Sequence, residues 1–313
     1  MPSHEPTKRE LTLVEVSPRD GLQSIKEVLS DDIKVKFILD LIASGHKNIE
    51  VGSFVSPKII PQMANTESII QKVRQHTHVK DLNLIALVGN EKGLERAMNC
   101  ELNTVAFVMS SSESFNKKNF GSSRNDSLKA YLKMSNRARK NGLSIRLYMS
   151  TINKCPYEGN ITREQFGQIS KKSIESIQPD QFVLSDTTGS LKPKEITELI
   201  HQSFDFITID KIGLHLHDPY GIAMCHIKEA LDVGIRIFDM SAAGLGGCPN
   251  APFSTGNIAS EELIHFIEQS GFQTGIDLKQ HIHATRELIS NFEFKSISKA
   301  FHNSLLVLNE GEP

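Results

Sequence analysis

The sequence feature that most constrains the fold is an alternation of eight short apolar runs with longer amphipathic stretches. Each run is rich in β-branched or other apolar residues and is short enough to predict a buried strand. The eight runs are Leu11–Val16, Asn48–Val51, Leu84–Val88, Thr104–Val108, Ser144–Met149, Gln181–Leu184, Lys211–His217 and Arg236–Met240. The intervening segments carry apolar residues at helical spacing, for example in Asp31–Ser44, Pro193–Ser203 and Ala223–Val233.

Eight strands that alternate with helices indicate parallel βα units, because parallel neighbours need crossover connections. We therefore predict an α/β fold of the (β/α)8 TIM-barrel type, with a doubly wound sheet as its main rival. The length of 313 residues fits one such barrel with an extension. We expect residues 1–285 to form the barrel domain and residues 286–313 a short C-terminal helical tail.

Composition and charge exclude several classes of function. Hydrophobic residues make up 39% of the chain, so a sizeable core can form, and the net charge of −2 gives no sign of a nucleic-acid partner. The longest apolar runs are far too short to span a bilayer, and the polar N-terminus has no apolar signal core. Four cysteines without a C-x-x-C pair indicate a reducing compartment. These features predict a soluble cytoplasmic protein.

Polar side chains follow the predicted strands at the positions where a TIM barrel places its chemistry. In this fold the active site lies where strands end and βα loops begin. Five groups meet this condition: Arg19 and Asp20 after the first strand, Glu50 at the end of the second, Asp186 after the sixth, His215 and His217 at the end of the seventh, and the segment 244–257 after the eighth.

His215 and His217 are the strongest candidates for metal ligands. On a strand, side chains at i and i+2 point to the same face, roughly 6.6 Å apart along the strand. Strand position alone is equally compatible with two core histidines. Two further H-x-H pairs are expected to be solvated or structural, since one lies in a polar connection and the other in a helical pattern: His76/His78 and His281/His283.

Oxygen donors at other strand ends favour the metal interpretation. Asp20 and Asn257 are such donors, and together with two histidines they suit an octahedral Mg²⁺ or Mn²⁺ better than a structural zinc. Alternatively, Asp20 is a turn residue before Gly21 and Asn257 is a loop or cap residue.

A glycine-dense loop, Gly244–Pro249, carries Cys248. The loop matches neither the dinucleotide-binding fingerprint nor a phosphate-binding loop. Its glycines allow close backbone approach and the mobility that a loop covering an active site needs. Cys248 is expected to exchange a proton there, although a cysteine is more often a small buried hydrophobe.

Several of these segments resemble the 3-hydroxy-3-methylglutaryl-CoA lyase family, within the metal-dependent TIM-barrel lyases and synthases. The resemblance spans roughly residues 11–280. The Arg-Asp and H-x-H elements are shared across the superfamily, whereas the Gly-Gly-Cys-Pro loop is specific to the lyase. The matching segments are Val14–Gln23, Ser53–Lys58, Cys155–Gly159, His215–Asp218 and Ala243–Pro249.

The resemblance implies roles for individual residues. It implies a divalent ion, Mg²⁺ or Mn²⁺, bound by Asp20, His215, His217 and Asn257. It also implies an acyl-CoA substrate, a homodimer and a place in leucine catabolism and ketone body metabolism. Catalytic roles fall on Arg19, Asp20, His215, Cys248 and Glu50, and substrate-binding roles on Arg19, Gln23, Ser53, Tyr148, Asp186 and Thr187.

The implied reaction is retro-Claisen cleavage of a thioester that carries a tertiary alcohol at its β carbon. Either His215 or Asp20 removes the alcohol proton, and the C2–C3 bond breaks to give a ketone and a thioester enolate. The positive charge of Arg19 stabilises the developing oxyanion. Cys248 protonates the enolate carbon, so that acetyl-CoA and acetoacetate form.

Departures from the family pattern affect the predicted acyl pocket rather than the metal ligands. Asn250 stands where the family usually has Tyr, Phe253 adds a bulky ring before the Gly-Asn pair, and Ser185 and Thr188 flank Asp186 where Gly and Ile are common. A close analogue with a different 3-alkyl branch is therefore a possible substrate. The rival interpretations are a Claisen-type synthase acting on a 2-oxo acid, a pyruvate-releasing aldolase and a non-catalytic metal-binding protein.

Overall fold

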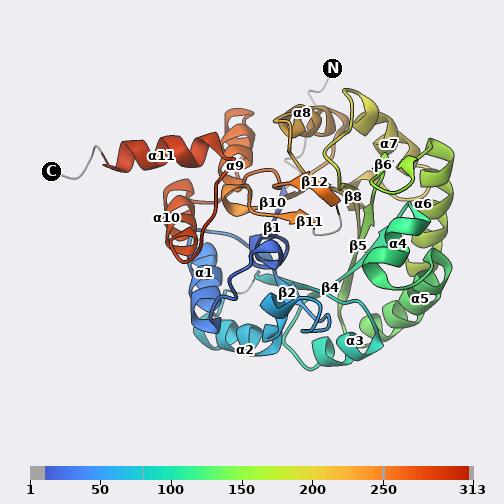
Figure 1. Ribbon diagram of the computed structural model, residues 1–313, viewed down its shortest axis with the longest axis horizontal. Helices are drawn as coiled ribbons and strands as arrows, with labels where there is room; N and C mark the ends of the chain where they lie inside the picture. Colours follow the sequence, from blue (N-terminus) through green and yellow to red (C-terminus); the bar gives the residue numbers. More distant parts are fainter. Residues whose placement is uncertain (1–10, 80, 249–250, 310–313) are drawn as a thin grey trace, which may run out of the picture.

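The computed structural model describes residues 11–79, 81–248 and 251–309, with side chains described except at 248, 251–255 and 305–309. Its centre is a closed barrel of eight parallel strands surrounded by helices (Figure 1). Around the barrel the strands follow the order β1-β10-β9-β8-β5-β4-β3-β2. Their bounds are β1 Thr12–Glu15, β2 Asn48–Ser53, β3 Asn83–Leu87, β4 Thr104–Ser110, β5 Ser144–Ser150, β8 Gln181–Asp186, β9 Ile212–Leu216 and β10 Ile237–Met240.

Helices cover the outside of the barrel. They are α1 Asp31–Ala43, α2 Thr66–His76, α3 Glu91–Met98, α4 Glu113–Phe120, α5 Arg124–Lys140, α6 Arg163–Ile177, α7 Glu195–Ser203, α8 Ala223–Val233, α9 Ser260–Gln269, α10 Leu278–Ile289 and α11 Lys299–Asn309. Short helical turns η1 to η5 occupy Ser17–Gly21, Leu22–Ser24, Pro61–Met63, Ile209–Lys211 and Ala242–Gly244. Within the described residues, no helix combines the length and apolar character needed to cross a membrane.

The structure confirms the predicted TIM barrel and all eight predicted barrel strands. The predicted helix at 223–233 is correct at both ends, and it stops at Gly234, whose φ of +101° is readily adopted only by glycine. The helix predicted from Pro193 instead begins at Glu195, because Lys194 adopts a left-handed conformation with a φ of +69°. Pro193 therefore lies before the first turn of α7.

Strand alternation divides the barrel side chains into an inner and an outer set. Val14 and Val16 point into the barrel and pack with Ile85 and Val183, whereas Leu13 belongs to the core between barrel and helices. The interior also contains Arg146, which is fully buried. Its guanidinium donates hydrogen bonds to Asp239 on β10 and to Gln181 on β8, so the barrel interior is partly polar.

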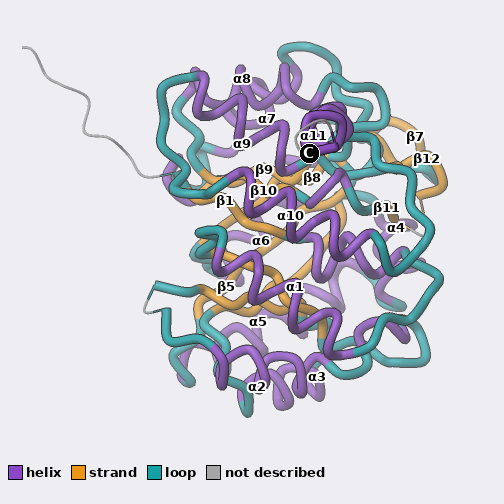
Figure 2. The backbone as a smooth tube through the Cα atoms, turned by 90° about the vertical axis from the view of Figure 1, so that its left-hand side faces the viewer, coloured by secondary structure: helices purple, strands orange, loops and turns teal. Residues whose placement is uncertain are grey.

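Two hairpins and the C-terminal helices extend this core. The hairpins are β6 Lys154–Cys155 with β7 Gly159–Asn160, and β11 Gly247–Cys248 with β12 Ala251–Thr255. Helix α10 lies beside α1, as both views show (Figures 1 and 2), and α11 packs against α9. The proposed domain boundary at residue 285 falls within α10, and the separation of a barrel domain from a tail remains a proposal.

Replacing Arg146 tests the polar barrel interior. We expect Arg146→Met to lower the free energy of unfolding by about 3–5 kcal/mol, because it leaves the buried Asp239 carboxylate without its countercharge. Lys36 pairs with Asp40 on the exposed face of α1, so Lys36→Ala should change stability by less than about 0.5 kcal/mol. Chemical denaturation measures both values, and an Arg146→Met protein as stable as the parent would contradict this account.

Candidate active site

The turn after β1 places Arg19 and Asp20 at the mouth of the barrel. The carbonyl of Val16 accepts hydrogen bonds from the amides of Arg19, Asp20 and Gly21, at 3.1, 2.7 and 3.3 Å, which tightens the chain directly after the strand. Gly21 is closely packed, since a Cβ there would lie 3.0 Å from Cβ of Leu245. The turn is therefore packed against the start of the glycine-rich loop.

Arg19 is held between two carboxylates. Its Nε and Nη2 bind Oε2 of Glu50 at 2.8 and 2.6 Å, and its Nη1 binds Oδ1 of Asp20. Burial opposes a charged Arg19, but Glu50 and Asp20 outweigh it and raise the pKa of the guanidinium. Burial raises the pKa of Glu50, although Arg19 acts against that rise. The arrangement fixes a permanent positive charge in the site.

Asp20 is ionised at neutral pH despite its burial. Burial alone would raise its pKa, but Arg19, followed by His215 and His217, lowers the pKa to about 2. Its Oδ1 also accepts a hydrogen bond from Nε2 of Gln23 at 2.8 Å. The second oxygen, Oδ2, lies 3.9 Å from Nε2 of His215, which brings the first and seventh barrel strands together at one point.

His215 and His217 both direct their Nε2 atoms toward Asp20. Nδ1 of His215 bonds Oδ2 of Asp239 at 3.1 Å, and Nδ1 of His217 bonds the carbonyl of Gly256 at 3.1 Å. These contacts favour a proton on each Nδ1 and leave each Nε2 as a potential donor to a cation. Burial lowers the pKa of His217 to about 4, with His215 adding to the effect. Burial also disfavours protonated His215, but Asp239 and Asp20 outweigh it and raise its pKa.

Asn257 completes the predicted ligand set. Its Nδ2 donates to Oδ2 of Asp20 at 2.8 Å and to the carbonyl of Leu245 at 3.0 Å. Its buried Oδ1 has no hydrogen-bond partner among the described residues. Asp20, His215 and His217 each offer a ligand atom within 4.8 Å of the others. An unpartnered amide oxygen beside two imidazole nitrogens and a carboxylate fits a divalent cation.

Asp239 and Arg146 are parts of the site that the sequence interpretation missed. Oδ2 of Asp239 accepts hydrogen bonds from His215 and, at 3.0 Å, from the Tyr148 hydroxyl, while Oδ1 pairs with Arg146. A carboxylate that holds the second nitrogen of a metal-binding imidazole orients the ring. Asp239 lies in the predicted strand 236–240. An acidic side chain that points into the barrel from this strand was the sequence signal that could have identified it.

The other predicted substrate-binding residues differ in how closely their contacts connect them to His215 and Arg19. Tyr148 is buried, with its ring centre 5.7 Å from that of His215 and 5.8 Å from the Arg19 guanidinium carbon. Ser53 is buried, and its hydroxyl has no partner among the described residues. Thr187 accepts a hydrogen bond from the amide of Thr151 at 3.0 Å.

Asp186 is tied to its own loop. One carboxylate oxygen accepts from the Leu191 amide at 2.9 Å and the other from the Thr188 hydroxyl at 3.4 Å. Burial raises the pKa of Asp186, although these and other loop hydrogen bonds act against the rise. These hydrogen bonds of Asp186 organise the 186–191 turn rather than reach the histidines, and its substrate-binding role stays a prediction.

The glycine-rich loop follows β10 and returns as the β11–β12 hairpin. Gly246 passes close to the ligand cluster, since a Cβ there would lie 3.4 Å from Oδ2 of Asp20. Cys248 is on β11, but its side chain lies outside the described residues, as do Asn250 and the Phe253 ring. The predicted acid/base role of the thiol therefore remains a proposal.

The two other H-x-H pairs lie away from this cluster. His76 ends α2 and His78 is exposed in the following connection. His281 is buried in α10, where its Nδ1 lies 3.0 Å from Nε2 of His46. His283 is exposed on the same helix. His281 and His46 also lie near Glu15, so a second buried group of ionisable side chains exists between the barrel and α10.

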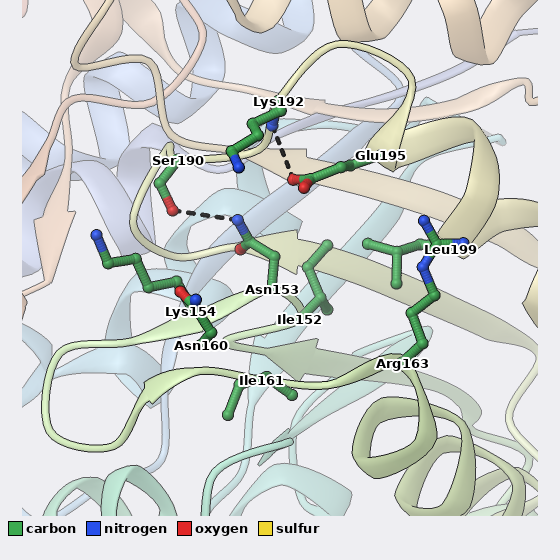
Figure 3. Close-up of a pocket in the computed structure, with 10 residues that line it drawn as sticks. All are labelled: Ile152, Asn153, Lys154, Asn160, Ile161, Arg163, Ser190, Lys192, Glu195 and Leu199. Atoms are coloured by element: carbon green, nitrogen blue, oxygen red, sulfur yellow. Dashed lines mark hydrogen bonds between the residues drawn. The ribbon is translucent and has the colours of Figure 1, made fainter.

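A separate cavity of about 320 Å³ opens beside the β6–β7 hairpin (Figure 3). Within it Asn153 donates a hydrogen bond to Ser190 at 3.1 Å, and the Lys192 amide donates to Glu195 at 2.9 Å. None of the predicted site residues lines it, so it is distinct from the ligand cluster. Its lining comprises Ile152, Asn153, Lys154, Asn160, Ile161, Arg163, Ser190, Lys192, Glu195 and Leu199.

Fold and site together define a TIM barrel with a buried side-chain cluster, at the C-terminal ends of its strands, that suits a divalent cation. The family model described as HMGL-like matches residues 10–289, and the chain belongs to this family. A 3-hydroxy-3-isohexenylglutaryl-CoA/hydroxymethylglutaryl-CoA lyase of Pseudomonas aeruginosa is 35% identical over 280 residues, which is 90% of this chain and 92% of that protein.

Solved structures of HMG-CoA lyases are also similar to this chain. The crystal structure of an HMG-CoA lyase from Bacillus subtilis has a TM-score of 0.90 and 32% identity, and covers 96% of this chain and 99% of its own. An HMG-CoA lyase from Acinetobacter baumannii, solved in complex with coenzyme A and 3-methylmalate, has a TM-score of 0.87 and 30% identity, and covers 96% of this chain and 95% of its own. The resemblance inferred from the motifs is thus confirmed over nearly the whole chain.

Asp239 provides a test of the site geometry. We expect Asp239→Asn to weaken Mn²⁺ binding by about 10- to 100-fold, because the amide holds the Nδ1–H of His215 less firmly than a carboxylate does. Tyr148→Phe removes the other hydrogen bond to the same oxygen, leaves the His215–Asp239 contact in place, and should change the affinity by less than about threefold. Calorimetric titration with Mn²⁺ gives both values, and equal affinities in the two variants would rule out this orienting role.

Proposed function

We propose that this protein is a divalent-metal-dependent carbon–carbon lyase that cleaves 3-hydroxy-3-methylglutaryl-CoA, or a close 3-alkyl analogue, to acetyl-CoA and acetoacetate. Arg19, fixed between Glu50 and Asp20 beside the predicted ligands, is the observation that carries this proposal. Family membership and the lyases among its relatives support it. The coenzyme A complex of one solved relative supports an acyl-CoA substrate.

The proposal also covers the metal ion, its ligands, the cellular compartment and the oligomeric state. We propose Mg²⁺ or Mn²⁺ as the ion, with Asp20, His215, His217 and Asn257 as its ligands, since their free donor atoms are oxygen and imidazole nitrogen. When bound, such an ion would lower the pKa of the substrate's tertiary alcohol. We further propose a cytoplasmic homodimer.

Arg19 supplies the fixed charge that the cleavage needs. As the C2–C3 bond breaks, its electron pair moves onto the thioester carbonyl and makes an enolate oxygen. The guanidinium of Arg19 is already held in place by Glu50, so it needs no reorganisation to meet that charge. Its raised pKa keeps it charged throughout the reaction.

Proton removal falls to His215 or Asp20, whose Nε2 and Oδ2 lie 3.9 Å apart. Asp20 is the weaker base, because its pKa is about 2 whereas the pKa of His215 is raised. His215 can use its Nε2 as a ligand or as a proton acceptor, but not as both at once. The Mn²⁺ affinity of His215→Ala separates the roles, since a large loss of binding is expected if His215 is a ligand and little change if it acts only as the base.

We propose that Cys248 returns a proton to the enolate carbon and so completes acetyl-CoA. The thiol is on the glycine-rich hairpin, whose preceding segment passes beside Asp20 and Asn257. The alcohol loses one proton to the base and the enolate carbon gains one from the thiol, and the proton balance closes when the base releases its proton and the thiolate takes one up from solvent.

Turnover of 3-hydroxy-3-methylglutaryl-CoA with Mn²⁺ tests the proposed reaction. We expect release of acetoacetate and acetyl-CoA, with kcat lowered by about 10²–10³ in Arg19→Met, which removes the oxyanion's countercharge. In Cys248→Ala we expect a loss of about 10²–10⁴, which reflects the missing proton donor. Cys225→Ala is the matched control, because Cys225 is an exposed cysteine on α8.

Chelation tests the metal requirement in the same assay. Dialysis against EDTA should abolish turnover, and added Mg²⁺ or Mn²⁺ should restore it. A folded, metal-loaded protein that leaves this thioester intact would refute the substrate assignment. Cleavage of 2-oxo acid adducts or of longer 3-alkyl thioesters would then identify the rival synthase, aldolase or analogue-specific reaction.

A further inference from the structure

The segment between α10 and α11 contacts both ends of the segment 244–256, which contains the glycine-rich loop and the β11–β12 hairpin. The contact is made by Ile297, which packs against Gly244 at one end and Gly256 at the other. A Cβ on Gly244 would lie 2.5 Å from Cγ1 of Ile297, and one on Gly256 would collide with Cδ1. Both glycines have a φ near +70°, a left-handed conformation that favours glycine, and the Ile297 side chain fills the space where a Cβ would stand.

The residues on either side of Ile297 are anchored to the start of the loop. The hydroxyl of its neighbour Ser296 donates to the carbonyl of Ala243 at 2.9 Å and accepts from the Ser298 amide at 3.0 Å. Phe301, at the start of α11, belongs to the same buried hydrophobic cluster as Ala243 and Ile282. The chain on both sides of Ile297 is therefore attached to the root of the same loop.

Gly256, which Ile297 contacts, is linked directly to two predicted metal ligands. The carbonyl of Gly256 accepts the hydrogen bond from Nδ1 of His217 at 3.1 Å, and Asn257 is the next residue. The amide of Gly256 donates to the carbonyl of Gly246 at 3.2 Å, which joins the two stems. A shift of Gly256 would therefore move the partner that orients His217 and the residue that carries the fourth ligand.

Two carboxylates, Glu15 on β1 and Glu261 on α9, hold the backbone at Ala242 and Ala243, directly before the glycine-rich loop. Glu15 accepts from the Ala242 amide at 3.1 Å, and Glu261 accepts from the Ala243 amide at 2.9 Å. Both carboxylates are fully buried, so removing either would also destabilise the fold. Ile297 differs because it is 45% exposed, which means that its side chain can be shortened with little loss of buried area.

We propose that Ile297 is a positioning residue for the lyase site. It sets the spacing of Gly244 and Gly256 and thereby the placement of His217, Asn257 and the strand that carries Cys248. The inference rests on the proposed function in assigning these residues to catalysis, whereas the effect on cation binding depends on geometry alone. The C-terminal segment is thus a part of the active site's support rather than only an appendage.

Ile297→Ala tests this role in the full-length protein. We expect the thermal midpoint to fall by less than about 2 °C, since the side chain is partly exposed. Mn²⁺ affinity and kcat should each fall by about tenfold, as is typical when a support of a metal ligand is lost, with a KM for the thioester within about threefold. Ile297→Val keeps Cγ1, the atom against Gly244, but loses Cδ1, the atom against Gly256, and should therefore recover only part of both losses.

Leu132→Ala is the control, because Leu132 is a similarly exposed aliphatic residue, at 42%, on the distant helix α5. It should leave Mn²⁺ affinity and kcat unchanged. Unchanged Mn²⁺ affinity and kcat in Ile297→Ala would overturn the proposal. A large fall in thermal midpoint that accounts for the losses, without recovery in Ile297→Val, would also overturn it by showing a merely structural role. Mn²⁺ titration needs no substrate, so this result stands apart from any failure of the proposed reaction.

Discussion

The site depends first on the ion pair that holds Arg19 between Glu50 and Asp20 inside the barrel mouth. Arg19 and Asp20 come from the turn after β1, whereas Glu50 lies within β2, which runs on to Ser53 rather than ending near Glu50 as predicted. Each of the three charges would be costly to bury alone. Together they keep Asp20 ionised, with a pKa of about 2, and leave its second oxygen facing the histidines. Glu50 thus holds Arg19 as the countercharge for Asp20 and, in the proposed reaction, as a fixed cation for the oxyanion.

Contacts behind the histidines decide which of their ring nitrogens face Asp20. Asp239 and the Gly256 carbonyl each occupy one nitrogen of a histidine, so the two remaining nitrogens turn to the same side. Arg146 in turn neutralises Asp239 from within the barrel. Barrel stability and ligand orientation therefore share residues, and the loop root held by Glu15, Glu261 and Ile297 continues this support outside the barrel.

Strand positions and the residues at their ends could be predicted from the sequence because both follow from local patterns. Apolar runs mark the strands, and the fold places Asp20, His215 and His217 at the same end. Asp239 was missed because an acidic residue inside an apolar run gives no local sign of its partner on another strand. The role of Ile297 depends on packing between segments about 40 residues apart or more, which no periodicity encodes.

Anomalous diffraction from crystals soaked with Mn²⁺ tests the central claim most directly, namely that these four residues form one cation site in a lyase. The account predicts a peak bounded by Asp20, His215, His217 and Asn257, lost in His217→Ala. A peak instead between His46, His281 and Glu15, or no peak in crystals whose solutions bind Mn²⁺, would contradict it.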